Sequence, residues 1–292
     1  MTSSEIKYLV LGANGLLGAQ LTAYLGKNCI PIYGPHSALS DPDAYRIDIS
    51  NEKKVRELIL KVSPDVVVNT VAMADVDWCE KNSVAAYAVN GHGVEYLATA
   101  CNEVSASFVQ ISTDYMFDGS KQSPYTEEDP PNPINEYGKS KLLGEEMARI
   151  ADKHLIVRVA WLYGDYKTNF ACNIVDKARR NQMQYVIADQ IGTPTYTKDV
   201  SDTIVQLVNR SQTGIYHVVN GGACSRYQQA RKICEIAGFD PEKINPIQSK
   251  KSSRIAIRPH YSVLDTAKLV DNAHISMRPW QEAISEYVKT LL

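Results

Sequence analysis

Four side chains with reactive or ionisable groups stand in two short stretches of the sequence. Thr113 and Asp114 follow the apolar run 108–111 closely, and Tyr137 and Lys141 lie four residues apart further along the chain. Residues at this spacing share one face of a helix, so the phenol and the ammonium group are expected side by side. A neighbouring cation favours the phenolate and lowers the pKa of a tyrosine, which would make Tyr137 an acid or base near neutral pH.

A glycine-rich loop near the start is the first element that could position such groups. The apolar run 8–11 is too short for a helix and predicts a buried strand, and an amphipathic stretch to residue 26 follows the loop. In a strand–loop–helix unit, glycines let the backbone turn tightly and approach a pyrophosphate at the helix N-terminus. The alternative is a tight turn without a ligand. The expected dinucleotide contacts in the loop are Gly12, Asn14, Gly15, Leu16, Leu17 and Gly18.

Strand and helix patterns then alternate along the first half of the chain. The runs 29–33, 65–72, 107–112 and 154–163 predict strands, and the patterns at 52–62, 83–103 and 142–150 predict helices. This alternation predicts an α/β fold with a Rossmann-type, doubly wound parallel sheet, which binds ligands at the carboxyl ends of its strands. Asp48, the segment 72–74, Thr113 and Asp114 would meet the glycine loop at that edge.

The pattern changes near residue 165, which predicts a second lobe. Helices are expected at 169–181, 198–209 and 225–238, strands at 185–188 and 214–219, and a turn at 190–195. We expect residues 1–165 to form an NAD(P)-binding Rossmann domain to which the chain returns around 190–222. Residues 166–189 and 223–292 would form a smaller α/β C-terminal substrate lobe. The basic segment 250–259 is either a solvated loop or a site that holds a substrate diphosphate across the crevice.

The composition excludes several classes of protein. The formal net charge of -2 argues against a nucleic-acid partner bound through its phosphates. Six cysteines are scattered without a Cys-x-x-Cys pair, so neither a redox motif nor a metal site is expected. The chain shows no signal-peptide pattern, and no apolar run reaches the roughly 18–20 residues of a membrane span. A cytoplasmic, reduced protein is therefore the default expectation.

The end of the second strand bears on the choice of cofactor. A dinucleotide with a free ribose 2′-hydroxyl usually meets an acid there, but residues 33–37 contain neither an acid nor an arginine. His36 and Ser37 could meet a 2′-phosphate, although a loop histidine is more often simply solvated. Both NADH and NADPH stay open. Asp48, further along, is either a cofactor contact or a turn and capping acid.

Together the motifs resemble those of the extended short-chain dehydrogenase/reductases. The resemblance is carried by Gly-x-x-Gly-x-x-Gly from Gly12, Ser-Thr-Asp-Tyr-x-Phe-Asp-Gly from Ser112, and Tyr-Gly-Lys-x-Lys from Tyr137. Within this family the closest likeness is to the dTDP-4-dehydrorhamnose reductase branch. The likeness continues through 158–164, 189–195 and 214–217, and through Arg258-Pro259 with 262–265. It therefore covers nearly the whole chain.

The resemblance implies reduction, by NADPH or NADH, of the 4-keto group of a nucleotide-linked 6-deoxyhexose. The implied reaction converts dTDP-4-dehydro-L-rhamnose to dTDP-L-rhamnose for cell-surface polysaccharide synthesis. It implies Tyr137 as proton donor, Lys141 as the ribose-binding lysine that lowers the tyrosine pKa, and Thr113 as the hydroxyl that orients the ketone. Further implied cofactor contacts are Asp48, Ile49, Ala72, Met73, Ala74 and Asn90, and implied substrate contacts are Thr113, Asp114, Trp161, Asn169 and Arg258. The expected partner is a nucleotide sugar, with a homodimer as an option.

One departure and two alternatives stay open. The branch commonly has Ala-His-Thr-Ala-Val-Asp where this chain has Ala-Met-Ala-Asp-Val-Asp at 72–77, which removes a hydroxyl and adds an acid near the expected sugar. A non-catalytic regulator, similar to the regulatory subunit of methionine adenosyltransferase, would also keep the tyrosine–lysine pair. The matched segments 161–164 and 189–190 speak against it. A nucleotide-sugar epimerase or dehydratase would hold NAD⁺ tightly without consuming it.

Overall fold

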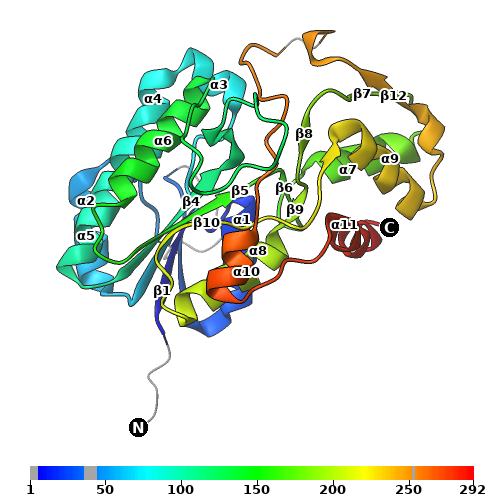
Figure 1. The fold of residues 1–292 in the computed structure, drawn as a ribbon. Helices are drawn as coiled ribbons and strands as arrows, with labels where there is room; N and C mark the ends of the chain where they lie inside the picture. Colours follow the sequence, from blue (N-terminus) through cyan, green and yellow to red (C-terminus); the bar gives the residue numbers. More distant parts are fainter. Residues whose placement is uncertain (1–5, 36–44, 252–253) are drawn as a thin grey trace.

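The computed structural model describes residues 6–35, 45–251 and 254–292. A six-stranded sheet lies at its centre, with the strand order β10-β5-β4-β3-β1-β2. Every neighbouring pair in this sheet is parallel. The chain thus runs outward from β1 in both directions, which is the doubly wound Rossmann arrangement. The predicted fold class is confirmed (Figure 1).

Helices cover both faces of the central sheet. Its strands are β1 (Tyr8–Leu11), β2 (Cys29–Ile32), β3 (Val66–Asn69), β4 (Ser107–Thr113), β5 (His154–Val159) and β10 (Gly214–His217). The α-helices around it are α1 (Leu16–Leu25), α2 (Glu52–Val62), α3 (Val76–Lys81), α4 (Ser83–Tyr87), α5 (Gly93–Glu103), α6 (Glu136–Ala148), α8 (Thr197–Asn209) and α10 (Ala267–Ala273). Shorter helices are η1 (Gly26–Asn28), η2 (Ala88–His92) and η3 (Asp114–Met116). No helix of the described residues is long and apolar enough to span a bilayer.

Two separate apolar cores explain why β1 is hydrophobic at every residue. Leu9 and Leu11 of β1 pack in one core with side chains of α2 and α5. Tyr8 and Val10 point the other way, into a core with side chains of α1, α8 and α10. Because side chains alternate along a strand, a strand covered on both faces is apolar throughout. Figure 1 shows α2 and α5 on the opposite side of the sheet from α1, α8 and α10.

A smaller lobe has its own apolar core beside the central sheet. It contains α7 (Phe170–Arg179), α9 (Arg226–Ala237), α11 (Trp280–Thr290), η4 (Pro241–Lys243), η5 (Ser249–Lys251) and the paired strands β7 (Gln184–Ile187) and β12 (Ile244–Ile247). Two short ladders lie between the lobes. They pair β6 (Leu162–Tyr163) with β9 (Thr195–Tyr196), and β8 (Ile191–Gly192) with β11 (Cys224–Ser225).

Three predicted elements differ from the observed ones. The single strand predicted at 154–163 is wrong, because β5 ends at Val159 and Trp161 turns the chain out of the sheet with a φ of 42°. The predicted turn at 190–195 contains β8 and the first residue of β9. The helix predicted at 83–103 is α4 and α5 joined by the π-helical segment η2, which contains Asn90.

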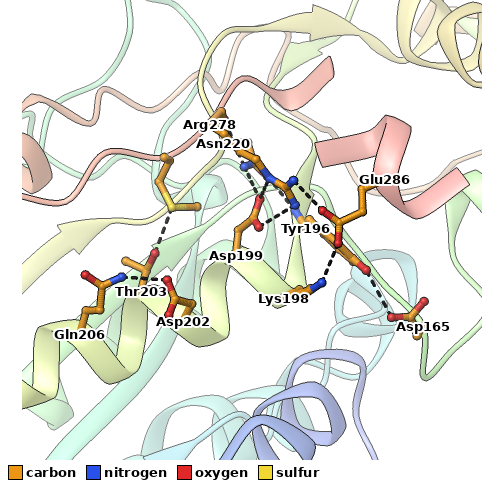
Figure 2. Close-up of polar contacts among 11 residues, drawn as sticks. Asp165, Tyr196, Lys198, Asp199, Asp202, Thr203, Gln206, Asn220, Arg278 and Glu286 are labelled. Carbon is orange, nitrogen blue, oxygen red and sulfur yellow. Dashed lines mark hydrogen bonds and ion pairs between the residues drawn. The ribbon is translucent and has the colours of Figure 1, made fainter. Parts of the chain in front are cut away.

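A polar network fixes the position of the small lobe against the sheet (Figure 2). The guanidinium of Arg278 donates to both carboxylate oxygens of Asp199, which lies on α8, and to Glu286 on α11. Lys198 donates to the same Glu286, and the amide of Asn220 donates to Asp199. Because α8 packs on the sheet and α11 packs in the small lobe, this network joins the two cores.

Candidate active site

The glycine loop lies between β1 and α1 at the carboxyl edge of the sheet. Gly12 has a φ of 83°, in the left-handed region that favours glycine, and its N–H donates to the carbonyl of Ile32 at 2.9 Å. A Cβ atom on Gly18 would lie 2.1 Å from the carbonyl oxygen of Gly12, so only glycine fits there. No side chain caps the first turn of α1, which starts after Gly15. This cradle fits a dinucleotide diphosphate.

The other predicted cofactor contacts near the loop differ in exposure and in which of their atoms a ligand could reach. Those with open surface are Asn14, Gly15 and Leu16. Leu17 and Ile49 bury their side chains in the two cores, which leaves their backbone groups. The carboxylate of Asp48 accepts from the N–H and the hydroxyl of Ser50 at 3.0 and 2.7 Å, and Asn51 caps α2. Asp48 is therefore a turn acid in this structure, and it lies exposed.

Asn90 holds the segment that follows β3. Its side-chain oxygen accepts from the N–H of Met73 at 2.8 Å, and its amide group donates to the Met73 carbonyl and to the hydroxyl of Ser140. Asn90 is fully buried, whereas Met73 and its neighbour Ala74 are exposed. Asn90 thus positions the predicted contacts 72–74 and ties them to α6. The π-helical turn η2 lets its side chain reach both partners.

Tyr137, Thr113 and Asp114 form one hydrogen-bonded group. Tyr137 lies in the first turn of α6, which Asn135 caps, and its hydroxyl hydrogen-bonds the hydroxyl of Thr113. Thr113 donates in turn to a carboxylate oxygen of Asp114 at 3.1 Å and accepts from the N–H of Tyr115 at 3.2 Å. The other oxygen of Asp114 accepts from the hydroxyl of Ser262 at 2.6 Å, so a residue from the end of the chain completes the group.

The pKa of Tyr137 is shifted in the direction opposite to the one expected from the sequence. Burial raises the pKa of Tyr137, while the hydrogen bond with Thr113 lowers it by less. Removal of water from around a phenolate costs more free energy than the neighbouring groups return. The predicted lowering of the phenol pKa by Lys141 is therefore wrong for the protein alone. Burial likewise raises the pKa of Asp114 to about 6, against the hydrogen bonds from Ser262 and Thr113.

Lys141 lies one turn after Tyr137 on α6, as the spacing predicts, and is almost fully buried. Its ammonium group donates to the carbonyl of Ile111 at 2.6 Å. Burial lowers the pKa of Lys141 to about 8, and the negative charge of Glu145 partly opposes this.

One turn after Lys141 on α6, a buried ion pair joins this helix to the sheet. Glu145 accepts from the guanidinium of Arg158 on β5 at 2.8 Å through each of its oxygens, and from the hydroxyl of Ser112 on β4. Each of the two charged residues is 1% exposed. Two parallel hydrogen bonds between planar groups allow one orientation only. The pair therefore sets the height and rotation of the helix that carries Tyr137 and Lys141.

A cleft of about 670 Å³ opens between the sheet and the small lobe. Its polar and charged lining residues include Asp75, Tyr115, Asn169, Lys177, Gln190, Arg226, Arg254, Arg258 and Ser262, and Trp161 and Phe170 also line it. Tyr137 and Thr113 lie next to the lining residue Tyr115. The Tyr115 and Tyr137 rings meet edge to face with centroids 5.8 Å apart, and the N–H of Tyr115 donates to Thr113. The lining carries more cations than acids, which suits an anionic ligand.

The predicted substrate contacts at this cleft have other roles as well. The amide of Asn169 donates to the carbonyl of Gly164 and to Tyr287, and its oxygen accepts from the first turn of α7, so its polar atoms are committed to the fold. Arg258 donates through both terminal nitrogens to Asp77 on α3 at 2.9 and 3.0 Å. That ion pair lowers the pKa of Asp77.

Several residues at the cleft were not among the predicted contacts. They are Tyr115, Lys177, Arg226 and Ser262. Tyr115 and Ser262 stand inside motifs that carried the resemblance, but Arg226 and Lys177 lie on helix faces without any motif. His36 and Ser37 lie outside the described residues, as do 252 and 253 within the basic segment. In the described part of the chain, no three His, Cys, Asp or Glu side chains converge as a metal site would need.

Comparison with known proteins finds a family model and relatives that match the chain over nearly its whole length. The chain matches the family model described as "RmlD substrate binding domain" over residues 6–292. It is 37% identical over 284 residues to the spore coat polysaccharide biosynthesis protein SpsK of Bacillus subtilis (strain 168), which covers 97% of each chain. It is 35% identical over 287 residues to the dTDP-4-dehydrorhamnose reductase of Streptomyces griseus, covering 96% of this chain and 92% of that protein.

Solved structures extend the similarity to three dimensions. The dTDP-4-dehydrorhamnose reductase of Bacillus anthracis str. Ames, determined in complex with NADP, superimposes with a TM-score of 0.88 at 32% identity. The superposition covers 98% of this chain and 100% of that one. The likeness therefore includes both the sheet that carries the glycine loop and the small lobe that closes the cleft.

Proposed function

The chain belongs to the family of the RmlD substrate binding domain, and from this premise we propose that it is an NAD(P)H-dependent reductase of a nucleotide-linked 4-keto-6-deoxyhexose. The reaction is dTDP-4-dehydro-L-rhamnose to dTDP-L-rhamnose, in the synthesis of cell-surface polysaccharide. Relatives with the name of that activity and a relative named for spore coat polysaccharide support this assignment. The observation that carries it is the hydrogen-bonded group of Tyr137, Thr113 and Asp114 beside the cleft.

The coenzyme is held by the glycine loop. The close packing of Gly18 on the Gly12 carbonyl and the uncapped N-terminus of α1 support a diphosphate at this place. The segment 72–74, held by Asn90, would lie under the ribose and nicotinamide. When bound, the reduced coenzyme supplies the hydride that is added to the ketone carbon. The NADP in the related crystal structure and the lack of an acid after β2 both favour NADPH.

Tyr137 donates the proton that the ketone oxygen needs. A proton donor must be neutral before the reaction, and the raised pKa of the buried phenol keeps it so at any physiological pH. Thr113 hydrogen-bonds the phenol and holds its hydroxyl in one direction. Lys141, whose pKa is about 8, supplies a positive charge next to the site and stabilises the phenolate that forms.

The cations of the cleft hold the nucleotide part of the substrate. A diphosphate is matched best by arginine, whose planar group donates two parallel hydrogen bonds. Arg254 and Arg258 line the cleft next to each other, and Asp77 keeps Arg258 in a fixed orientation. This assignment takes up the second alternative for the basic segment, in which it contacts substrate.

Substrate-dependent oxidation of the coenzyme tests the proposal. The purified chain is incubated with NADPH or NADH and with a panel of nucleotide-linked 4-keto sugars, and absorbance at the nicotinamide band is followed. We expect oxidation with dTDP-4-dehydro-L-rhamnose, faster with NADPH, and release of dTDP-L-rhamnose. Binding of NADPH without any oxidation would support a regulator instead. NAD⁺ that stays bound through purification and is not consumed would support an epimerase.

A further inference from the structure

We propose that the guanidinium group of Arg226 binds the hexose of the substrate and so determines which sugar is accepted, with Trp161 as the surface that supports it. The proposal rests on the proposed function. It assigns a role to a side chain on α9 that no motif singled out. It also changes the role of Trp161, which we had expected to touch the sugar itself.

Arg226 lies within cation–π distance of two aromatic rings that line the cleft. The central carbon of its guanidinium is 3.6 Å from the centroid of the Trp161 ring and 5.1 Å from that of Phe170. A cation over an indole face is the most favourable arrangement of this type. Gly192 packs against the same indole so closely that a Cβ there would lie 2.5 Å from a ring atom. Trp161 is therefore covered by two neighbours, and Arg226 is one of them.

The hydrogen bonds of Arg226 leave part of its donor edge for a ligand. Within residues 6–35, 45–251 and 254–292, its one hydrogen bond runs from Nη1 to the side-chain oxygen of Gln229 at 3.1 Å. A guanidinium carries five N–H donors in a fixed plane and no acceptor. Arg226 is a lining residue of the cleft and only partly exposed. Donors that are shielded from bulk solvent and face a cleft select ligands with oxygen acceptors.

The position of Arg226 points to the sugar and not to the diphosphate. Arg226 lines the same cleft as Tyr115, whose ring meets that of Tyr137, and as Ser262, whose hydroxyl donates to Asp114. The ketone that Tyr137 would protonate belongs to the hexose, so the groups around Asp114 surround the hexose. Burial lowers the pKa of Arg226 to about 10, which still leaves it charged at neutral pH.

A hexose is a suitable ligand for the N–H donors of Arg226. Its hydroxyl oxygens accept hydrogen bonds, and a buried donor that loses such a partner discriminates strongly against the analogue without it. Stacking on Trp161 and the bond to Gln229 hold the guanidinium still before substrate arrives, which reduces the entropic cost of binding.

Equilibrium binding to two ligands, dTDP-L-rhamnose and dTDP, tests the proposal without any need for turnover. Calorimetry on NADPH-loaded enzyme compares the wild type, Arg226→Gln and Arg226→Lys. We expect the affinity of Arg226→Gln for dTDP-L-rhamnose to fall about 10- to 100-fold, the range for hydrogen bonds to a charged group. Its affinity for dTDP should stay within about 3-fold, because dTDP has no hexose. Arg226→Lys should lose affinity for the sugar nucleotide too, because lysine lacks the planar fork.

A matched control lies on the same helix. Arg231→Gln removes an arginine that also stacks on an aromatic ring, Tyr227, but pairs with Glu242 at the surface. It should change neither affinity, and unchanged NADPH binding in all variants shows that the fold is intact. Equal losses for both ligands, or no loss for either, would overturn the proposal. A wild type that binds dTDP-L-rhamnose more tightly than dTDP but never reduces a keto sugar refutes the proposed function and leaves this inference standing.

Discussion

Asp114 has a buried carboxyl group that is linked to Tyr137 through the hydroxyl of Thr113. Ser262 and Thr113 each donate a hydrogen bond to it, which favours the charged form. Desolvation is the larger effect and raises its pKa from 3.8 to about 6. A raised carboxyl pKa means that the folded protein binds this proton more tightly than the unfolded chain does. Asp114 thus links stability and proton binding at one residue.

Replacement of Asp114 by Asn should remove one component of the pH dependence of stability. The stabilisation from the bound proton is complete below the unfolded pKa, and is lost as pH rises through the folded value of about 6. Between pH 4 and pH 7 the wild type should therefore lose about 2 kcal/mol relative to Asp114→Asn. Urea unfolding of both proteins across this range measures the difference. Parallel curves would show that Asp114 titrates normally.

For individual residues, the sequence predicted which side chains share a helix face, but it did not predict how deeply they are buried or which distant groups they contact. The spacing of Tyr137 and Lys141 was sufficient to place both on one helix, because helical geometry is local. The direction of the Tyr137 pKa shift depends on how deeply the phenol is buried, which packing decides. Asn169 was predicted to contact substrate, yet its amide is committed to Gly164 and Tyr287, a partner far along the chain.

The helix α6 is positioned by the buried pair of Glu145 and Arg158. Glu145→Gln should lower the free energy of unfolding by about 3–5 kcal/mol, because it leaves Arg158 as an uncompensated buried charge. The double variant Glu145→Leu/Arg158→Met should recover much of that loss. Urea denaturation measures both. Glu103→Gln, which breaks the exposed pair with Arg56, serves as control and should leave the midpoint unchanged. A loss no larger than that of the control would contradict this role.

The approach of α1 to the glycine loop leaves no room for a side chain. Gly18→Ala would place a Cβ 2.1 Å from the carbonyl oxygen of Gly12, so the helix must shift and the diphosphate cradle changes shape. We expect NADPH affinity to fall about 5- to 100-fold, the equivalent of 1–3 kcal/mol of overpacking. Gly221→Ala is the control, because its Cβ would meet no atom closer than 3.5 Å. Unchanged NADPH affinity in Gly18→Ala would argue against the cradle.

Elements with a clear period were predicted from the sequence, and the irregular ones were not. The helix predicted at 225–238 is α9, with a capping box at Ser225 and Gly238 at its end, because cap residues are local signals. The break after β5 depends on the positive φ of Trp161, a conformation that nothing in the sequence indicates for a bulky residue. The stacking of Arg226 follows from that break, so neither could be anticipated.

The two lobes act together only if their relative position is maintained. Arg278→Met would leave Asp199 and Glu286 without their shared cation. The groups are partly exposed, so we expect a loss of only about 1–2 kcal/mol in unfolding free energy. Amide exchange should rise in α11 before it rises in β4, and KM for the sugar nucleotide should increase. Exchange that rises equally in both elements would show that the network stabilises the whole protein without a specific role between the lobes.

The overall architecture was within reach of the sequence, but the cleft was not. Alternating strands and helices predicted the parallel sheet, and the strand at 214–217 joins β5 at its edge. The cleft brings Ala74, Tyr115, Arg226 and Ser262 together from four distant segments. Contacts over such separations are set by tertiary packing, so only the resemblance to a known family gave a view of the pocket before the structure.

Tyr137→Phe tests the central claim most directly, because it removes one hydroxyl and keeps the ring that packs edge to face with Tyr115. Single-turnover oxidation of NADPH by dTDP-4-dehydro-L-rhamnose is compared in the wild type and the variant, with NADPH affinity measured alongside. The proton-donor role predicts that the rate of turnover falls about 10²- to 10⁴-fold while NADPH affinity is preserved. A variant that still turns over within a few-fold of the wild-type rate would contradict it.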